Sequence, residues 1–141
     1  MKILILCTGN SCRSQMAEAW LQSFDPSMEV FSAGVRPEDR VSPYAIKVMK
    51  EAEIDISQKV AKDVSQFTGD SFDYVITVCD SAQKACPVFA GKVQHRLHMA
   101  FEDPALASGT EEEIIVVYRR VRDQIREWFW DFYINEIQLK K

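Results

Sequence analysis

A short apolar run opens the chain and leads directly into a polar loop. Residues 3–6 read Ile-Leu-Ile-Leu, and a continuous apolar run of this length is typical of a strand buried on both faces of a parallel sheet. A loop of glycine, asparagine and serine follows, and residues 15–21 are rich in helix-forming side chains. We therefore expect the fold to begin with a strand–loop–helix unit, with the loop at the carboxyl end of a buried strand.

Further strands and helices alternate along the chain. Strands are predicted over 28–33, 73–78 and 93–99, and helices over 43–52, near 64–67, over 80–85 and from Thr110 or Ser108 onward. This alternation favours an α/β fold, a three-layer sandwich around a central, mostly parallel four-stranded sheet. In the last helix, apolar residues at helical spacing are expected to form one buried stripe: Ile114, Val117, Tyr118, Val121, Ile125, Trp128, Phe129 and Phe132.

Length and composition narrow the classes of protein. The 141 residues suit a single domain spanning 1–141, and 47% hydrophobic with 27% charged residues is ordinary for a globular protein. The net charge of -4 and the lack of a dense basic patch argue against nucleic acid as a partner. The apolar run after Lys2 is too short for a signal peptide, and no stretch has the length of a membrane span. We expect a cytoplasmic protein, in which the four cysteines are catalytic, redox-active or metal-binding.

The loop from Cys7 to Ser14 has the composition of an oxyanion site. A loop that curls at the start of a helix directs several backbone N–H groups at one point, and the Arg13 guanidinium can add a two-pronged contact. The same donors would stabilise a thiolate on Cys7, which makes Cys7 the candidate nucleophile. The remaining candidate substrate-binding residues are Thr8, Gly9, Asn10, Ser11, Cys12, Arg13 and Ser14. The alternative is a glycine turn with two buried cysteines, and within the loop Cys12 is expected only to support it.

A second pair of cysteines follows a different strand. Cys79 comes directly after the strand predicted over 73–78, and the carboxyl ends of parallel strands gather at one edge of a sheet. Cys7 and Cys79 are therefore expected near one site, and Cys86 lies seven residues further on. Burial as small apolar side chains is one alternative. Zinc is another, but the spacings within the two cysteine pairs do not match the tight pairs of structural zinc sites, so we expect no metal there.

The motifs of this chain resemble a known superfamily. Residues 7–18 (Cys-Thr-Gly-Asn-Ser-Cys-Arg-Ser-Gln-Met-Ala-Glu) look like the signature of the low-molecular-weight tyrosine phosphatases, and in particular of their thioredoxin-coupled arsenate reductase branch. The similarity continues through Ser32-Ala33-Gly34, Asp55-Ile56-Ser57, Val78-Cys79, Cys86-Pro87 and Asp103-Pro104-Ala105. It covers nearly the whole chain and fades in the C-terminal helix.

The resemblance implies a reaction and roles for these residues. Arsenate would bind in the loop, which phosphate or sulfate would also fit, and would be reduced to arsenite by Cys7, then Cys79, then Cys86. Thioredoxin would reduce the final disulfide, with glutaredoxin or a small thiol as the other candidate reductants. Asp103 would supply the proton, with Glu102 as runner-up. The rival functions are a low-molecular-weight protein tyrosine phosphatase and a non-enzymatic redox or oxyanion sensor.

The resemblance also bears on cofactors. No tightly bound cofactor is expected, although members of the branch can bind a potassium ion near the loop, and Asn10, Glu18 and Ser32 match positions that hold it. Lys62 stands where the pattern has an aspartate. We expect the ammonium group of Lys62 to take the place of the cation. The two histidines, His95 and His98, have no partner at ligand spacing and are expected to be surface or support residues.

Overall fold

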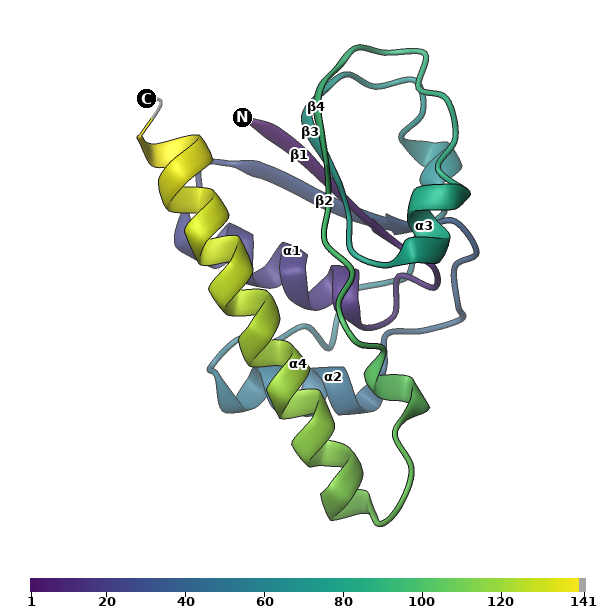
Figure 1. The fold of residues 1–141 in the computed structure, drawn as a ribbon, viewed down its shortest axis with the longest axis vertical. Helices are drawn as coiled ribbons and strands as arrows, with labels where there is room; N and C mark the ends of the chain where they lie inside the picture. Colours follow the sequence, from purple (N-terminus) through teal and green to yellow (C-terminus); the bar gives the residue numbers. More distant parts are fainter. Residues whose placement is uncertain (140–141) are drawn as a thin grey trace.

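The fold, described for residues 1–139 of a computed structural model, alternates strands and helices (Figure 1). Short 3₁₀ helices interrupt the loops, and the last helix continues into a π-helical turn. In chain order the elements are β1 (Lys2–Cys7), α1 (Arg13–Phe24), β2 (Glu29–Gly34), α2 (Pro43–Glu51), η1 (Val64–Gln66), β3 (Phe72–Thr77), α3 (Asp80–Lys84), β4 (Val93–His98), η2 (Pro104–Leu106), α4 (Glu111–Phe132) and η3 (Tyr133–Gln138). Each predicted element is present, with ends that differ by at most three residues.

The four strands form one sheet in the order β2-β1-β3-β4, and every neighbouring pair is parallel. The apolar run of β1 is central: its residues Ile3 to Leu6 have no exposed surface. A strand can be apolar at successive positions only when both faces of its sheet are covered, as the sequence predicted.

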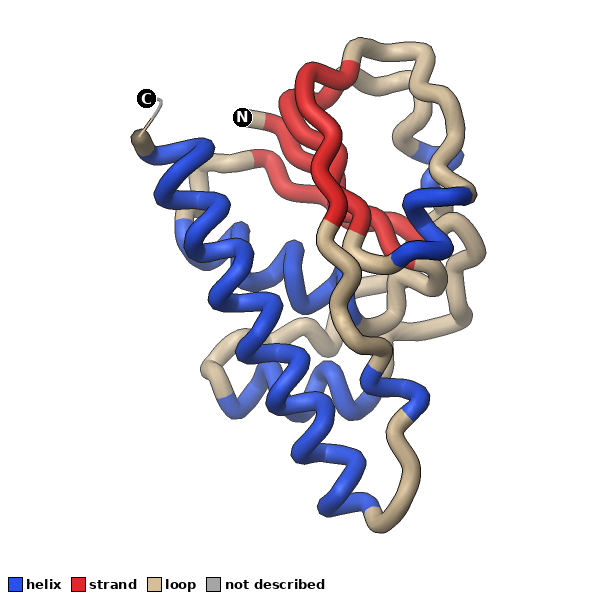
Figure 2. Tube along the Cα trace, viewed as in Figure 1, coloured by secondary structure: helices blue, strands red, loops and turns tan. Residues whose placement is uncertain are grey.

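Helices cover both faces of the sheet (Figure 1). On one face, Tyr74 of β3 packs edge-on against Phe132 of α4, and α1 packs on α4. On the other face, Phe31 of β2 packs against Phe67, just after η1, and α3 lies against β1 and β3. The coloured trace in Figure 2 shows the sheet between these layers. The predicted three-layer α/β sandwich is confirmed.

The apolar stripe of α4 differs in detail from the prediction. Ile115 is buried, whereas Ile114, Val117 and Trp128 are only partly buried against the core. The helix begins at the Thr110 cap, whose side chain accepts from the backbone N–H of Glu113 in a capping box. The stripe is rotated because α4 contacts both α1 and α2, and no periodicity within one helix reveals where two neighbours will lie.

The carboxyl ends of β1 and β3 lie side by side, since Leu6 pairs with Thr77. The chain leaves β1 at Cys7 for the loop before α1, and it leaves β3 for Val78 and Cys79 before α3. Two loops that are distant in sequence therefore meet at one edge of the sheet. Within residues 1–139, no helix is both long and apolar enough to cross a membrane.

Candidate active site

The loop between β1 and α1 is held from outside by the segment that follows β2. Carbonyl oxygens of the loop accept backbone hydrogen bonds at 2.7–3.1 Å, from Val35 to Cys7, Arg36 to Thr8, Glu38 to Gly9 and Ser42 to Ser11. In a trans peptide the N–H points opposite to the C=O, so outward carbonyls turn the following N–H groups inward. One of them, the N–H of Asn10, donates to the Cys7 sulfur at 3.2 Å.

Close approach of backbone to backbone shapes the loop. A Cβ on Gly34 would lie 2.6 Å from the carbonyl oxygen of Thr8, so only glycine allows β2 to pass so near the loop. Asn10 has a φ of 52°, in the left-handed region that asparagine tolerates better than most residues.

Cys7 is a buried thiol with two hydrogen-bond partners. Its sulfur lies 2.9 Å from the Ser14 hydroxyl, and its side chain has only 3% of its surface exposed. Burial raises the pKa of Cys7, while hydrogen bonds from Ser14 and from the Asn10 backbone act in the opposite direction. The hydrogen-bond donors that were expected to stabilise a Cys7 thiolate are therefore present. In this structure, the cost of burying the negative charge on sulfur outweighs their effect.

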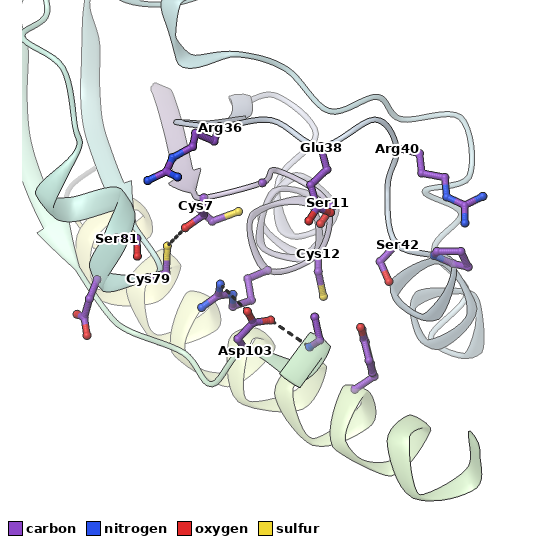
Figure 3. A pocket seen from close by; sticks show the side chains of 17 residues that line it. Cys7, Ser11, Cys12, Arg36, Glu38, Arg40, Ser42, Cys79, Ser81 and Asp103 are labelled. Carbon is purple, nitrogen blue, oxygen red and sulfur yellow. Dashed lines mark hydrogen bonds and ion pairs between the residues drawn. The ribbon is translucent and has the colours of Figure 1, made fainter. Parts of the chain in front are cut away.

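A cavity of about 610 Å³ opens over the loop (Figure 3). Cys7, Cys79 and Asp103 line it, together with Thr8, Gly9, Ser11, Cys12 and Arg13 from the loop. Asn10 and Ser14 are fully buried and do not line it; they contact Cys7 from behind. Cys12 faces the cavity as a buried thiol whose pKa is raised by burial.

The acidic side of the cavity is formed by Asp103. Its carboxylate lies 3.5 Å from the Arg13 guanidinium and accepts from the backbone N–H of Ala105 at 3.0 Å. Arg13 also donates to the carbonyl oxygen of Phe101 at 3.1 Å. Glu102, the runner-up for this role, instead pairs with Arg120 of α4 and does not line the cavity. Of the two neighbouring carboxylates, only Asp103 is in position to exchange a proton with a group in the cavity.

The two cysteines of the second pair, Cys79 and Cys86, line different cavities. Cys79 lies beside Cys7 at the cavity, with its sulfur 3.2 Å from the Thr8 hydroxyl (Figure 3). Cys86, on the far side of α3, lines a separate hollow, where the Arg96 guanidinium lies 3.9 Å from its sulfur. All four cysteines are free thiols. The structure thus brings Cys7 and Cys79 to one cavity and leaves Cys86 outside it.

Other residues at the site were not singled out from the sequence. Arg36, Glu38 and Arg40 form part of the cavity rim, as do Ser42 and Tyr118. The only sequence signal for the first three was a cluster of opposite charges just after a strand, which is common in solvent-exposed loops.

His98 also has a structural role that its sequence position did not reveal. One ring nitrogen lies 2.7 Å from the Thr77 hydroxyl and the other lies 2.9 Å from the Asp80 carboxylate, at the first residue of α3. The sequence showed no partner for His98 because the parallel pairing of β3 with β4 is what sets it beside Thr77. His98 is therefore a support residue that links the sheet to α3.

A buried polar network beneath the loop corrects the expectation for Lys62. Asn10, Ser32 and Glu18 lie together as expected, but the ammonium group that pairs with Glu18 belongs to Lys59. The Lys62 ammonium instead donates to the carbonyl oxygen of Val60 at 3.0 Å. Lys59, three residues before the position assigned by the resemblance, is thus the lysine in contact with Glu18. Among residues 1–139, no group of three or more histidine, cysteine, aspartate or glutamate side chains is arranged to hold a metal ion.

The chain is similar to proteins of known activity over almost its whole length. Residues 2–141 match the low molecular weight phosphotyrosine protein phosphatase family. The chain belongs to this family. An arsenate reductase from Halalkalibacterium halodurans is 45% identical over 124 residues, which cover 87% of this chain and 88% of the relative. The family resemblance inferred from residues 7–18 is therefore confirmed.

Solved structures extend the comparison to two activities. An arsenate reductase in the phosphate binding state superposes with a TM-score of 0.80 at 32% identity, covering 95% of this chain and 98% of that one. An arginine phosphatase from Geobacillus stearothermophilus superposes with a TM-score of 0.76 at 26% identity, covering 99% and 94%. The low molecular weight phosphatase fold thus accommodates both a reductase and a phosphatase, and the side chains at the cavity must distinguish between them.

Proposed function

We propose that this protein reduces arsenate to arsenite by a relay of three thiols, with thioredoxin as the final reductant. The observation that carries the proposal is the second thiol at the nucleophile's cavity: Cys79 lies beside Cys7 and close to Thr8. Hydrolysis of a phosphate ester requires one cysteine, whereas a two-electron reduction requires another thiol that can reach the first. The identity of 45% with an arsenate reductase supports the same reading.

In the proposed binding step, the loop holds the tetrahedral oxyanion. Inward N–H groups and the Arg13 guanidinium stabilise its negative charge, and phosphate or sulfate would compete for the same donors. Thr8, Gly9, Ser11, Cys12 and Arg13 face the substrate from the cavity wall. Asn10 and Ser14 act from behind, where they orient the Cys7 sulfur.

In the proposed first chemical step, the Cys7 thiolate attacks arsenic and a new S–As bond forms. One arsenate oxygen leaves as water, and Asp103 supplies the proton. In the second step, the Cys79 thiolate attacks the Cys7 sulfur. The S–As bond breaks, its electron pair leaves with arsenic as arsenite, and a Cys7–Cys79 disulfide remains.

In the proposed third step, the Cys86 thiolate attacks the Cys79 sulfur and releases Cys7 as a thiolate. The resulting Cys79–Cys86 disulfide is reduced by the two thiols of thioredoxin, so that one arsenate and one dithiol yield arsenite, water and one disulfide. Cys86 must approach Cys79 for this step, which requires α3 to rearrange. The three thiols that cycle in this way are free in the structure, which suits the reducing cytoplasm.

The substitution Cys79→Ser tests the relay. Arsenate reduction is expected to disappear, whereas hydrolysis of an aryl phosphate, which needs only Cys7, the loop and Asp103, is expected to persist at its original rate. Turnover is followed with the thioredoxin system and, in parallel, with the glutaredoxin system. Arsenate reduction that survives Cys79→Ser, or that proceeds only with glutaredoxin, would contradict the three-thiol scheme.

A phosphatase is the second candidate function, and a specific observation favours it. The arginine phosphatase superposes over nearly the whole chain, and the cavity contains a cysteine nucleophile with a carboxylic acid nearby. A phosphatase would hydrolyse phosphotyrosine or phosphoarginine with catalytic turnover in the Cys79→Ser protein and in the wild type alike. Fast turnover of either phosphorylated substrate, together with no turnover of arsenate, would establish this alternative.

A further inference from the structure

A line of hydrogen bonds runs from the Cys7 sulfur to a buried carboxylate. The side-chain amide nitrogen of Asn10 donates to the Ser14 hydroxyl at 2.8 Å and to the Ser32 hydroxyl at 2.9 Å. The Ser32 hydroxyl donates in turn to Glu18 at 2.8 Å. Ser14 accepts from the amide, so its own hydrogen remains for the Cys7 sulfur, 2.9 Å away. The hydrogen bonds are therefore donated outward from Asn10, through Ser14 toward the Cys7 sulfur at one end and through Ser32 toward Glu18 at the other.

The charge at the far end of this line is balanced by Lys59. Glu18 has only 6% of its surface exposed, and a buried carboxylate is strongly disfavoured without a partner. The Lys59 ammonium pairs with one carboxylate oxygen, while Ser32 donates to the other. Burial lowers the pKa of Lys62, the other lysine nearby, and its ammonium is directed to Val60 instead. Lys59 is therefore the cation in direct contact with Glu18.

A potassium ion does not fit this arrangement. Such an ion needs several oxygen ligands that replace its hydration shell, but the Lys59 ammonium already pairs with one Glu18 oxygen and the Ser32 hydroxyl donates to the other. The side-chain oxygen of Asn10 accepts from the Lys62 backbone N–H at 2.8 Å and from Gln15 at 3.0 Å. The side-chain oxygens of Asn10 and Glu18, which the family resemblance assigned to the ion, thus already accept hydrogen bonds from other residues of this chain.

We propose that Lys59 is a positioning residue for the nucleophile, a cation supplied by the chain itself that makes the reaction independent of potassium. Its ammonium group faces the Glu18 carboxylate, and a carboxylate can only accept from Ser32. Asn10 must then donate to both hydroxyls, which leaves Ser14 to donate to the Cys7 thiolate. The proposal rests on the proposed role of Cys7 as nucleophile, and it holds whether the oxyanion is arsenate or phosphate.

The test is the rate of Cys7 alkylation by iodoacetamide as a function of pH, followed on the Cys7 peptide by mass spectrometry. Lys59→Met is expected to move the profile upward by about one pH unit, so that Cys7 reacts about tenfold more slowly near neutrality. Lys59→Arg is expected to restore most of the rate. Lys47→Met, which removes an exposed lysine of α2, is the matched control and should leave the profile unchanged. A wild-type profile in Lys59→Met would overturn the proposal.

Two further arms keep the proposal falsifiable if Lys59→Met folds poorly. The double variant Glu18→Gln/Lys59→Met has no unpaired charge, so it is expected to fold and to react faster than Lys59→Met alone. Potassium chloride, compared with tetramethylammonium chloride at equal ionic strength, is expected to have no effect on the wild type. A potassium-specific rise in wild-type reactivity, or a double variant no better than the single one, would contradict the proposal. Failure to reduce arsenate would refute the proposed function but leave these alkylation results intact.

Discussion

At the residue scale, the Cys7 sulfur is subject to two opposing influences on its pKa. Burial raises the pKa, and the hydrogen bond from Ser14 lowers it. Ser14→Ala removes only the lowering influence, so the pKa is expected to rise further and the thiolate fraction near neutral pH to fall. The rising limb of kcat/KM against pH should move to higher pH, with an approximately tenfold loss near neutrality. Ser65→Ala, at an exposed serine of η1, is the control.

An unchanged pH profile in Ser14→Ala would mean that the Ser14 hydroxyl does not stabilise the attacking form of Cys7. A loss of activity that is uniform across pH would instead indicate a disturbed loop. Alkylation of Cys7 measured in parallel separates these outcomes, because it reports the thiolate without requiring substrate to bind.

At the element scale, the end of β2 determines the shape of the loop. Gly34→Ala would place a Cβ 2.6 Å from the Thr8 carbonyl oxygen, so either the strand or the loop must shift. We expect a loss of about 1–3 kcal/mol in the free energy of unfolding, and weaker binding of the oxyanion. Gly69→Ala is the matched control, because its Cβ would meet no atom within 4 Å. Urea denaturation and a sulfate titration measure the two effects, and equal behaviour of both variants would contradict this view of the loop.

The short helix α3 is the element that the relay must disturb. A disulfide requires Cα atoms about 5.5 Å apart, whereas Cys79 and Cys86 lie at opposite ends of α3. Formation of a Cys79–Cys86 disulfide is therefore expected to break the helical bonds from Gln83 to Cys79 and from Ala85 to Ser81. Hydrogen exchange should lose protection at these two amides in the oxidised protein, while the amide of Val78, bonded to Leu6, stays protected. Full protection after oxidation would exclude the proposed third step.

The same elements show what the sequence could predict about the fold. The continuous apolar run of β1 and the alternation of strands with helices predicted the elements and their layers, because these signals are local. The prediction failed where contacts between helices decide which residues are buried. The buried stripe of α4 includes Ile115 rather than Ile114, because both α1 and α2 pack against that helix.

At the scale of the whole molecule, the candidate site is assembled from distant segments. Sheet topology was enough to predict that Cys7 and Cys79 would meet, since both follow strands that end at one edge. The pairing of Lys59 with Glu18 spans 41 positions and depends on the path of the chain between α1 and the segment that carries Lys59. The contact of His98 with Asp80 likewise exists only after β4 has paired with β3. Such contacts have no periodic or motif signal, because folding alone brings their residues together.

Helix α4 packs against α1 and α2, and the three helices form the layer that supports the active site. Ile125 on this helix has no exposed surface, whereas Val116 on the same helix is 54% exposed. Ile125→Ala is expected to lower the free energy of unfolding by about 2–5 kcal/mol, from lost burial and an unfilled cavity. Val116→Ala should change it by less than about 0.5 kcal/mol. If the domain unfolds as one unit, urea denaturation followed by tryptophan fluorescence and by Cys7 alkylation will give the same midpoint in each variant, with an unchanged m-value. Separate midpoints in Ile125→Ala would show that the helical layer can loosen while the loop stays formed.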